Sequence, residues 1–472
     1  MSTTKKIAHN TMIQLIGKAI STFLGLLAVA IMTRHLGVEQ FGWYVTTTGF
    51  LLFIGILCDF GFSVVTASML SESKHDQKKL FNNLFTWRLI TALIFNGSAP
   101  VIFLFLPYPH TIKMGVLVLS LSFFFISLNH VFIGYYQHKL KMIIQVTAEV
   151  LSRLVLVAGL SLMMIGSYGF LPMMFVITVA ASIYTGYMWL RSDRIKLCLD
   201  KKISKDIFKK MWPVAIAVVF NAVYLQSDKV ILPLYASQVD VGLYGAAFRV
   251  VEIVAQVIAM IMGIMLPLLT HAWASKKSEE FKKYFQMSFD LVNLMVLPMI
   301  VGILVLSTPI MKLVGGHEFI SSGIILRVFT LAMLGIVFGM IFGHIALAIG
   351  KQRQSMWIYV TDAIISLTAY IILIPLYGVW GAVIVAVFSQ VYAGLGLMML
   401  ACYYAKLWPS GKVFLKIIFS SAVMGYLVYI LPSPHVLVSI VYGMIIYGTL
   451  GLALKIISKQ TIKEILSKKT LS

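Results

Sequence analysis

The sequence predicts an all-α polytopic membrane protein of about 14 transmembrane helices, and three observations lead there. Of 472 residues, 60% are hydrophobic and only 12% are charged, whereas soluble domains are about half apolar and a quarter charged. The apolar residues come in blocks of about twenty, which is the length a helix needs to cross roughly 30 Å of hydrocarbon. Basic residues gather in the short connections between these blocks. A soluble globular protein is therefore excluded.

The apolar blocks divide the chain into two groups of helices. We expect an N-terminal six-helix bundle at 1–190, a basic cytoplasmic linker at 191–212, a C-terminal six-helix bundle at 213–405, and two extra helices with a basic tail at 406–472. The predicted spans, in order, are 11–33, 43–70, 85–106, 112–134, 146–166, 169–190, 213–235, 242–270, 287–307, 323–349, 356–374, 378–404, 413–431 and 436–457.

Each group of spans has its own justification. The first span is too long for the apolar core of a cleavable signal and ends in Thr33-Arg34-His35, without a small-residue cleavage site. The linker 191–212 is the largest change in composition, and we interpret it as a solvated amphipathic segment on the inner surface, the alternative being a specific partner site. "FGWY" (41–44) and "VGLY" (241–244) open the second and eighth spans, and "SYGFLP" (167–172) and "LYGVWGA" (376–382) open the sixth and twelfth. This repeat predicts two similar bundles with a cleft between them, as transporters have.

Charge placement predicts the orientation and excludes several functions. Alternate connections and the tail hold about 28 Lys and Arg residues, against about three (Arg34, Lys113, Lys312) on the other side, which places both termini in the cytoplasm. A net charge of +21 distributed in this way does not indicate nucleic-acid binding. Three distant cysteines indicate neither a disulfide nor a zinc site. No phosphate-binding loop, metal site or catalytic constellation is present, so we expect no enzyme, no cofactor and no nucleotide motor.

Ionisable residues inside the predicted spans are the main functional signal. A charge at the bilayer centre costs about 2.5–3.5 kcal/mol even on the lenient scale, so these residues must face each other, water or a ligand. Glu149 and Arg153 lie on one face at i,i+4, and Arg249 and Glu252 at i,i+3. Each pair taken alone could simply hold helices together, but the whole set favours a polar cleft. The set is Asp59, Glu149, Arg153, Asp228, Lys229, Arg249, Glu252, Asp290, Arg327 and Asp362.

Several motifs resemble bacterial polysaccharide-unit flippases of the Wzx group. The similar segments are "TRHLGVEQFGWY" (33–44), "CDFGFS" (58–63), "FIGYYQHKLKM" (132–142), "QSDKVIL…VGLYGAAFRV" (226–250), "LAIGKQRQ" (347–354) and "IPLYGVWGA" (374–382). The "GYYQ" at 134–137 departs from the family's more usual form. The superfamily also contains multidrug antiporters and the lipid II flippase. The resemblance implies a V-shaped pair of six-helix bundles plus two C-terminal helices.

The resemblance also implies a substrate, namely an undecaprenyl-diphosphate-linked oligosaccharide moved from the cytoplasmic to the outer leaflet of the bacterial inner membrane. Arg and Lys suit a diphosphate, because they offer charge-assisted hydrogen bonds. The expected substrate-binding residues are Arg34, Arg88, Arg153, Lys229, Arg249, Tyr224, Gln226 and Tyr244. The expected charge-balancing or ion-coupling residues are Asp59, Glu149, Asp228, Glu252, Asp290 and Asp362, with H⁺ or Na⁺ as the coupling ion.

Membrane lipids are expected partners, and family context adds a polysaccharide polymerase and a chain-length regulator. The alternative is a cation-coupled multidrug or metabolite antiporter, although a site for cationic drugs should have a net acidic lining, and the interior charges here are balanced. A membrane protein with a purely structural role is a third reading. The final polymer, whether O-antigen, capsule or exopolysaccharide, is left open.

Overall fold

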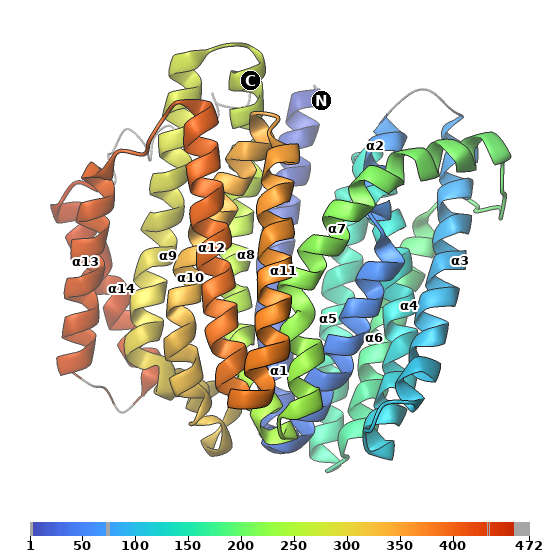
Figure 1. Ribbon diagram of the computed structural model, residues 1–472, viewed down its shortest axis with the longest axis horizontal. Coiled ribbons are helices and arrows are strands. Elements are labelled where there is room, and N and C mark those ends of the chain that lie inside the picture. The colour runs from blue at the N-terminus through green and yellow to red at the C-terminus, as the bar shows by residue number, and fades with distance from the viewer. Residues whose placement is uncertain (1–2, 72–75, 432, 434, 457–472) are drawn as a thin grey trace. The chain divides into compact units, whose positions relative to one another are not determined.

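The computed structural model describes the backbone of residues 3–71, 76–431, 433 and 435–456, and within these ranges all regular elements are helices (Figure 1). A short 3-10 helix, η1 (His317–Phe319), separates α9 from α10. The α-helices are α1 (Thr3–Asp59), α2 (Phe62–Ser71), α3 (Gln77–Leu104), α4 (His110–His138), α5 (Met142–Ile165), α6 (Phe170–Arg191), α7 (Lys201–Tyr235), α8 (Gln238–Ala274), α9 (Ser278–Gly315), α10 (Ser322–Ala348), α11 (Gln352–Tyr377), α12 (Val379–Ala405), α13 (Gly411–Ile430) and α14 (Val436–Ala453).

Twelve of the described helices are long and apolar enough to cross a membrane. They are α1, α3 to α6 and α8 to α14, and α7, which covers the predicted span 213–235, is not among them. The predicted all-α membrane fold is therefore confirmed. The remaining difference from the fourteen predicted spans lies in α1, which contains two of them.

The chain reverses inside α1, at Gly37. The first half of α1 runs along α5, because Gly17 faces Val146 and Gly25 faces Arg153. The second half runs along α4 in the same direction, because Thr47 lies beside Gly115 and Gly55 faces Phe123. Since α4 and α5 are joined by a three-residue turn and run in opposite directions, the two halves of α1 are also antiparallel. Gly37 permits the reversal with φ 71° and ψ 179°, a conformation essentially restricted to glycine.

Packing divides the chain into two units, the first ending at Gly242 and the second beginning at Leu243. Within the first unit α3 packs on α4, α4 on α6, and α5 on α6. Within the second unit α9 packs on α10, α10 on α12, and α11 on α12, with α13 and α14 on α9. The same pairs recur after six helices, as an internal repeat of six spans requires. The domain boundaries at residues 190 and 213 stay predictions.

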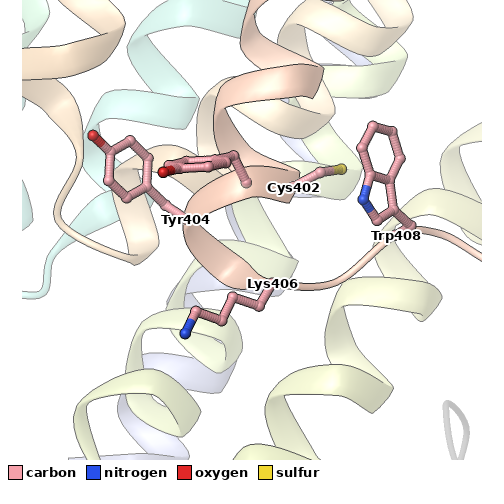
Figure 2. A pocket seen from close by; sticks show the side chains of 5 residues that line it. Cys402, Tyr404, Lys406 and Trp408 are labelled. Atoms are coloured by element: carbon pink, nitrogen blue, oxygen red, sulfur yellow. The ribbon is translucent and has the colours of Figure 1, made fainter.

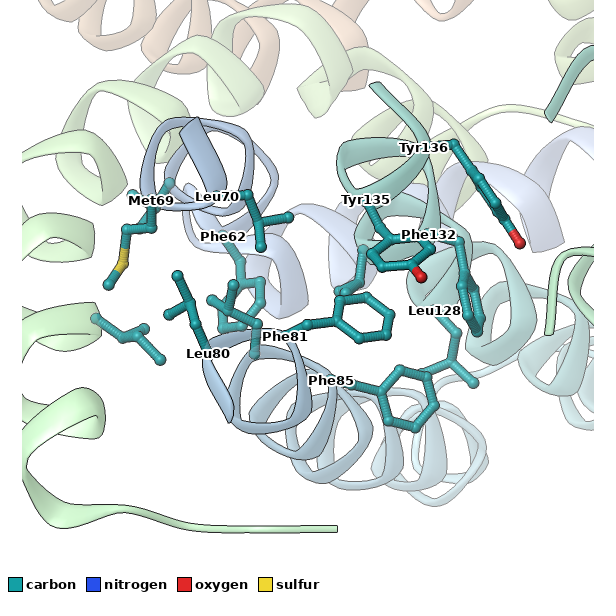
Figure 3. Close-up of a cluster of buried hydrophobic side chains, with 14 of the residues drawn as sticks. Phe62, Met69, Leu70, Leu80, Phe81, Phe85, Leu128, Phe132, Tyr135 and Tyr136 are labelled. Carbon is teal, nitrogen blue, oxygen red and sulfur yellow. The ribbon is translucent and has the colours of Figure 1, made fainter. Parts of the chain in front are cut away.

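A cluster of buried apolar side chains occupies one end of the first unit (Figure 3). Phe62 and Met69 come from α2, Phe81 and Phe85 from α3, and Phe132 from α4. Figure 3 shows these rings and aliphatic chains pointing toward one another. The first turns of α7 add Ile203, Ile207 and Met211, which share one helix face because they are four residues apart. The amphipathic start of α7 is thereby packed against the bundle.

The connection between α6 and α7 is extended over residues 193–200, which we call the strap. Its alternate N–H groups, those of Lys196, Cys198 and Asp200, donate to side-chain oxygens of α3 at 3.2, 3.0 and 2.6 Å. These acceptors are Asn82, Thr86 and Asn83, respectively. Successive groups in extended chain point to opposite sides, so every second N–H can reach the same helix.

The two ends of the strap are held by ion pairs. Lys139 lies 2.5 Å from Asp193, and Lys79 lies 2.7 Å from Asp200. The Lys79 ammonium and the first N–H groups of α7 hold the pKa of Asp200 at about 2, below its ordinary value. The linker predicted at 191–212 is thus a docked extended segment followed by an amphipathic helix.

Candidate functional site

Two clusters of charged residues lie within the helices of the first unit, and the first is centred on Arg88. This side chain is 1% exposed, and its guanidinium lies 3.0 Å from an Asp59 oxygen. It also donates to the carbonyl oxygens of Ser127 at 2.7 Å and Cys58 at 3.3 Å. Arg88 therefore ties α3 to the end of α1 and to α4, with its donors directed at protein groups.

Ser63 extends this cluster toward α4. Its hydroxyl donates to Asp59 and lies 2.8 Å from Nδ1 of His130. The sequence analysis identified Asp59 and Arg88 but neither His130 nor Ser63. Asp59 and Ser63 are four residues apart in sequence, so the spacing that paired other residues could have pointed to Ser63.

The second cluster lies along the seam between α1 and α5. Lys18 lies 3.9 Å from Glu149, so Glu149 has a partner on another helix rather than Arg153, its neighbour at i,i+4. The parallel packing of α1 along α5 explains this, because Gly17 sits opposite Val146 and Gly25 sits opposite Arg153. Lys18 was not among the residues predicted for the site. A partner on another helix leaves no spacing signal in the sequence.

Arg153 differs from Arg88 in its surroundings. A Cβ added at Gly25 would lie 3.9 Å from the guanidinium carbon, so the side chain crosses the bare face that this glycine leaves on α1. Arg153 is half-buried, and among the described residues it forms no ion pair or hydrogen bond. Its charge is therefore available to a ligand.

The remaining predicted residues of the first unit lie on α7 and at the turn in α1. Lys229 donates to Gln226 at 3.0 Å, while its neighbour Asp228 is buried, so the two charged side chains have different surroundings, as their adjacency predicts. The side chain of Tyr224 lies outside the described residues. Arg34 is exposed beside the reversal at Gly37.

In the second unit, Arg249 and Glu252 form the ion pair that their spacing predicts, at 2.8 Å, with both side chains about one-third exposed. Tyr244 is buried, and its ring packs on Phe248 and Phe329. Arg327 donates weakly to Ser307 at 3.4 Å. The chain thus places Arg249 and Glu252 together and encloses the Tyr244 ring among other aromatic side chains.

Two acidic residues of the second unit have neutral partners. Asp290 accepts a hydrogen bond from Gln286 at 2.9 Å. Asp362 is completely buried on α11, and one of its oxygens accepts from the Ser389 hydroxyl of α12 at 2.9 Å. Its other oxygen, Oδ1, has no hydrogen-bond partner within the described part of the chain. A buried carboxylate without a cationic partner is costly, so Asp362 can hold a proton or a bound cation.

Comparison with known proteins decides the family. Residues 31–323, more than half of the chain, match the family model described as "Polysaccharide biosynthesis protein". The chain belongs to the polysaccharide biosynthesis protein family. No curated protein sequence matches the chain significantly.

Several solved structures share the fold of this chain, although their sequence identity to it is low. The lipid II flippase MurJ in an inward closed conformation is 17% identical, with a TM-score of 0.76 over 93% of this chain and 98% of that chain. An inward-facing multidrug resistance MATE transporter of the MOP superfamily is 14% identical, with a TM-score of 0.66 over 83% of this chain and 98% of that chain. A MOP superfamily transporter from Pyrococcus furiosus is 14% identical, with a TM-score of 0.59 over 85% and 96%.

Proposed function

We propose that this protein is a flippase that moves an undecaprenyl-diphosphate-linked oligosaccharide from the cytoplasmic to the outer leaflet of a bacterial inner membrane. Family membership supports a role in polysaccharide biosynthesis. The fold shared with MurJ and MATE transporters supports transport by alternating access, with the two repeats moving about a site near the midplane. The positive-inside asymmetry supports cytoplasmic termini.

Arg153 is the observation that carries the proposal. It lies in a membrane-spanning helix, and no carboxylate among the described residues neutralises it. Keeping such a charge in hydrocarbon costs about 2.5–3.5 kcal/mol or more, so an anionic ligand is the natural partner. Arginine binds phosphate oxygens with two parallel hydrogen bonds, which suits a diphosphate. Lys229 and Gln226 offer further polar groups for the diphosphate or sugars in the same unit.

Replacing Arg153 tests the proposal. In a strain that lacks its own repeat-unit flippase, Arg153→Ala should lower surface polysaccharide at least tenfold, because one bidentate charged contact contributes on the order of 1.5–3 kcal/mol. Arg153→Lys should retain an intermediate activity. The matched control is Arg353→Ala, which removes the same charge from an exposed position at the start of α11. Lipid-linked glycan should accumulate on the cytoplasmic face with Arg153→Ala only.

Wild-type polysaccharide levels with normally expressed Arg153→Ala would remove this residue from the substrate site.

The same strains distinguish the alternative function. A cation-coupled multidrug antiporter would change drug resistance on deletion and leave lipid-linked glycan on its normal face. The buried acid Asp362 is the observation that favours this alternative, since acidic groups attract cationic substrates.

For the flippase we propose that Asp362 is the ion-coupling residue, with H⁺ or Na⁺ as the ion. Its burial and its open oxygen support a group whose charge changes during the cycle. Asp59 is less suited, because Arg88 already neutralises it. A polymerase and a chain-length regulator are the expected partners downstream, since a translocated repeat unit must be joined to others.

A further inference from the structure

A pocket lies at the end of α12, and none of its lining residues is among those expected to bind the substrate or a coupling ion. It has a volume of about 560 Å³ and is lined by Cys402, Tyr403, Tyr404, Lys406 and Trp408 (Figure 2). Figure 2 shows Tyr404 on one side of the helix end, Trp408 on the other, and Lys406 below them. This volume falls in the range of pockets that hold small organic ligands, about 300–1,000 Å³.

The backbone around this pocket is fixed by hydrogen bonds. Lys406 ends α12 in a left-handed conformation, with φ 53° and ψ 34°, and its N–H donates to the Cys402 carbonyl. Four residues later, Ser410 is held by Gln286 through two hydrogen bonds, of 2.7 and 3.2 Å. Gln286 in turn donates to Asp290, which fixes the orientation of its amide. The loop that carries Trp408 is therefore anchored at both ends.

The lining of the pocket is cationic and aromatic. Lys406 contributes an ammonium group to the lining. Lys351, from the turn before α11, does not line the pocket itself, but its ammonium lies 4.2 Å from the centre of the ring of the lining residue Tyr404. The phenols of Tyr403 and Tyr404 and the indole of Trp408 can donate hydrogen bonds. No carboxylate from the described part of the chain lines this pocket, so its polar groups are suited to an anion.

The surroundings add to this positive potential. The contacts of Lys351 with Tyr404 and of Gln286 with Ser410 bring the α8–α9, α10–α11 and α12–α13 turns to one end of the second unit. Two acidic residues, Glu279 and Glu280, lie in these turns. The basic residues there are Lys276, Lys277, Lys282, Lys283, Lys351, Arg353, Lys406 and Lys412.

Trp408 and Tyr403 show where this pocket meets the bilayer. They are 67% and 75% exposed; Tyr403 lies in the last turn of the membrane-spanning helix α12, and Trp408 lies just beyond its end. Exposed Trp and Tyr at that depth lie among lipid headgroups, because one part of each side chain is apolar and the other polar. A ligand here would have a phosphate near the lysines and an apolar part toward the hydrocarbon.

We propose that this pocket binds the phosphate group of an anionic phospholipid, with Lys406 and Lys351 neutralising the phosphate and Tyr404 and Trp408 enclosing the headgroup. The shared chemistry is a phosphate ester, and the membrane is the source that we favour, because the pocket is larger than inorganic phosphate requires and opens beside exposed interfacial aromatics. None of the residues that line the site is among those expected to bind the substrate.

Lipid binding to the purified full-length protein tests this proposal. Detergent-solubilised protein is titrated with phosphatidylglycerol or phosphatidylcholine, and bound lipid is counted by native mass spectrometry. We expect tighter binding of phosphatidylglycerol, weakened roughly fivefold by Lys406→Gln and further by the Lys351→Gln/Lys406→Gln double variant, since partly exposed charge pairs contribute modestly. The matched control is Lys412→Gln, an exposed lysine outside the pocket lining.

A second arm uses millimolar inorganic phosphate as competitor. Unchanged lipid binding identifies the lipid headgroup as the occupant, whereas displacement that is lost in Lys406→Gln identifies a phosphate site that solution can also fill, and both results support the site. Equal effects of Lys406→Gln and Lys412→Gln, or no preference for phosphatidylglycerol over phosphatidylcholine, would overturn it. Glycan export by these variants, measured separately, reports on the flippase proposal and not on this site.

Discussion

The two intramembrane arginines of the first unit, Arg88 and Arg153, are stabilised in different ways. Arg88 has a carboxylate and two carbonyl oxygens within reach of its guanidinium. Removing Asp59 would leave Arg88 as an uncompensated buried charge, which is strongly destabilising. Arg153 lies across the face of α1 that Gly25 leaves bare, and among the described residues it forms no ion pair or hydrogen bond. The first arrangement suits a fixed structural link, and the second suits a residue that binds a transient anion.

Gly37 gives a prediction about stability at the same scale. Gly37→Ala should lower the free energy of unfolding by about 1–3 kcal/mol, because alanine must adopt a conformation that a Cβ makes unfavourable. Thermal unfolding of the protein in detergent measures the loss. The matched control is Gly97→Ala on α3, where an added Cβ would meet nothing within 4 Å. Equal melting temperatures for the two variants would show that the reversal in α1 does not depend on this glycine.

Among the candidate residues, one of the two local pairs formed as predicted, and the pairs between different helices were not predicted. Arg249 and Glu252 pair as their i,i+3 spacing predicts, because the period of the helix alone brings them together. Lys18 with Glu149 and Asp362 with Ser389 join different helices. Hydrophobic periodicity indicates which face of a helix is buried, but it does not indicate which residue of another helix packs against that face. The predicted roles in substrate binding stay predictions.

Among the elements, the strap shows how a polar loop is fixed to a membrane helix. In the extended residues 193–200, every second backbone N–H donates to a side-chain oxygen of α3, on Asn82, Asn83 or Thr86. Trp87 donates to Ser204 at 2.8 Å, which continues the contact into α7. The basic, Pro-free composition of 191–212 could not reveal this docking, because the acceptors lie more than a hundred residues earlier in the chain.

The strap leads to a prediction about pH. The folded pKa of Asp200, about 2, is lower than its unfolded value near 3.9, so its contribution to docking is complete above about pH 4 and is lost as the pH falls toward 2. Hydrogen-exchange protection of residues 195–200, corrected for intrinsic rates, should decline over that range. Asp200→Asn should keep the N-cap, lose the ion pair with Lys79, and weaken this pH dependence. The Lys139–Asp193 pair at the other end of the strap accounts for what remains.

Lys205→Gln is the control for the strap, because Lys205 is exposed on the first turns of α7 and its loss should leave protection unchanged. If Asp200→Asn keeps the full pH dependence of the wild type, then Asp200 does not hold the strap. A fall of protection for both variants would instead indicate a general effect of charge on this surface.

For the molecule as a whole, composition and block length predicted the all-α membrane fold and most spans, since the cost of exposing polar backbone to lipid leaves few alternatives. The internal repeat is also visible in the sequence, as "FGWY" and "VGLY". It recurs in the structure, because the helices from α3 through α6 pack on one another in the same pairs as the helices from α9 through α12. The main difference lies in α1. The sequence predicts two helices separated by a loop, whereas in the structure the two halves of α1 are joined directly at Gly37.

Coupling between an ion and the substrate is a property of the whole molecule, and Asp362 allows it to be tested. Asp362→Asn is always neutral, so glycan export should fall at least tenfold and no longer respond to the imposed H⁺ or Na⁺ gradient, because a neutral amide cannot gain or lose charge during the cycle. Reconstituted vesicles with lipid-linked glycan measure both quantities. Asp76→Asn, an exposed N-cap of α3 that the amide can also serve, is the matched control. If Asp362→Asn exports glycan at the wild-type rate and still needs the gradient, the coupling residue lies elsewhere, and the buried carboxyl has only a structural role with Ser389.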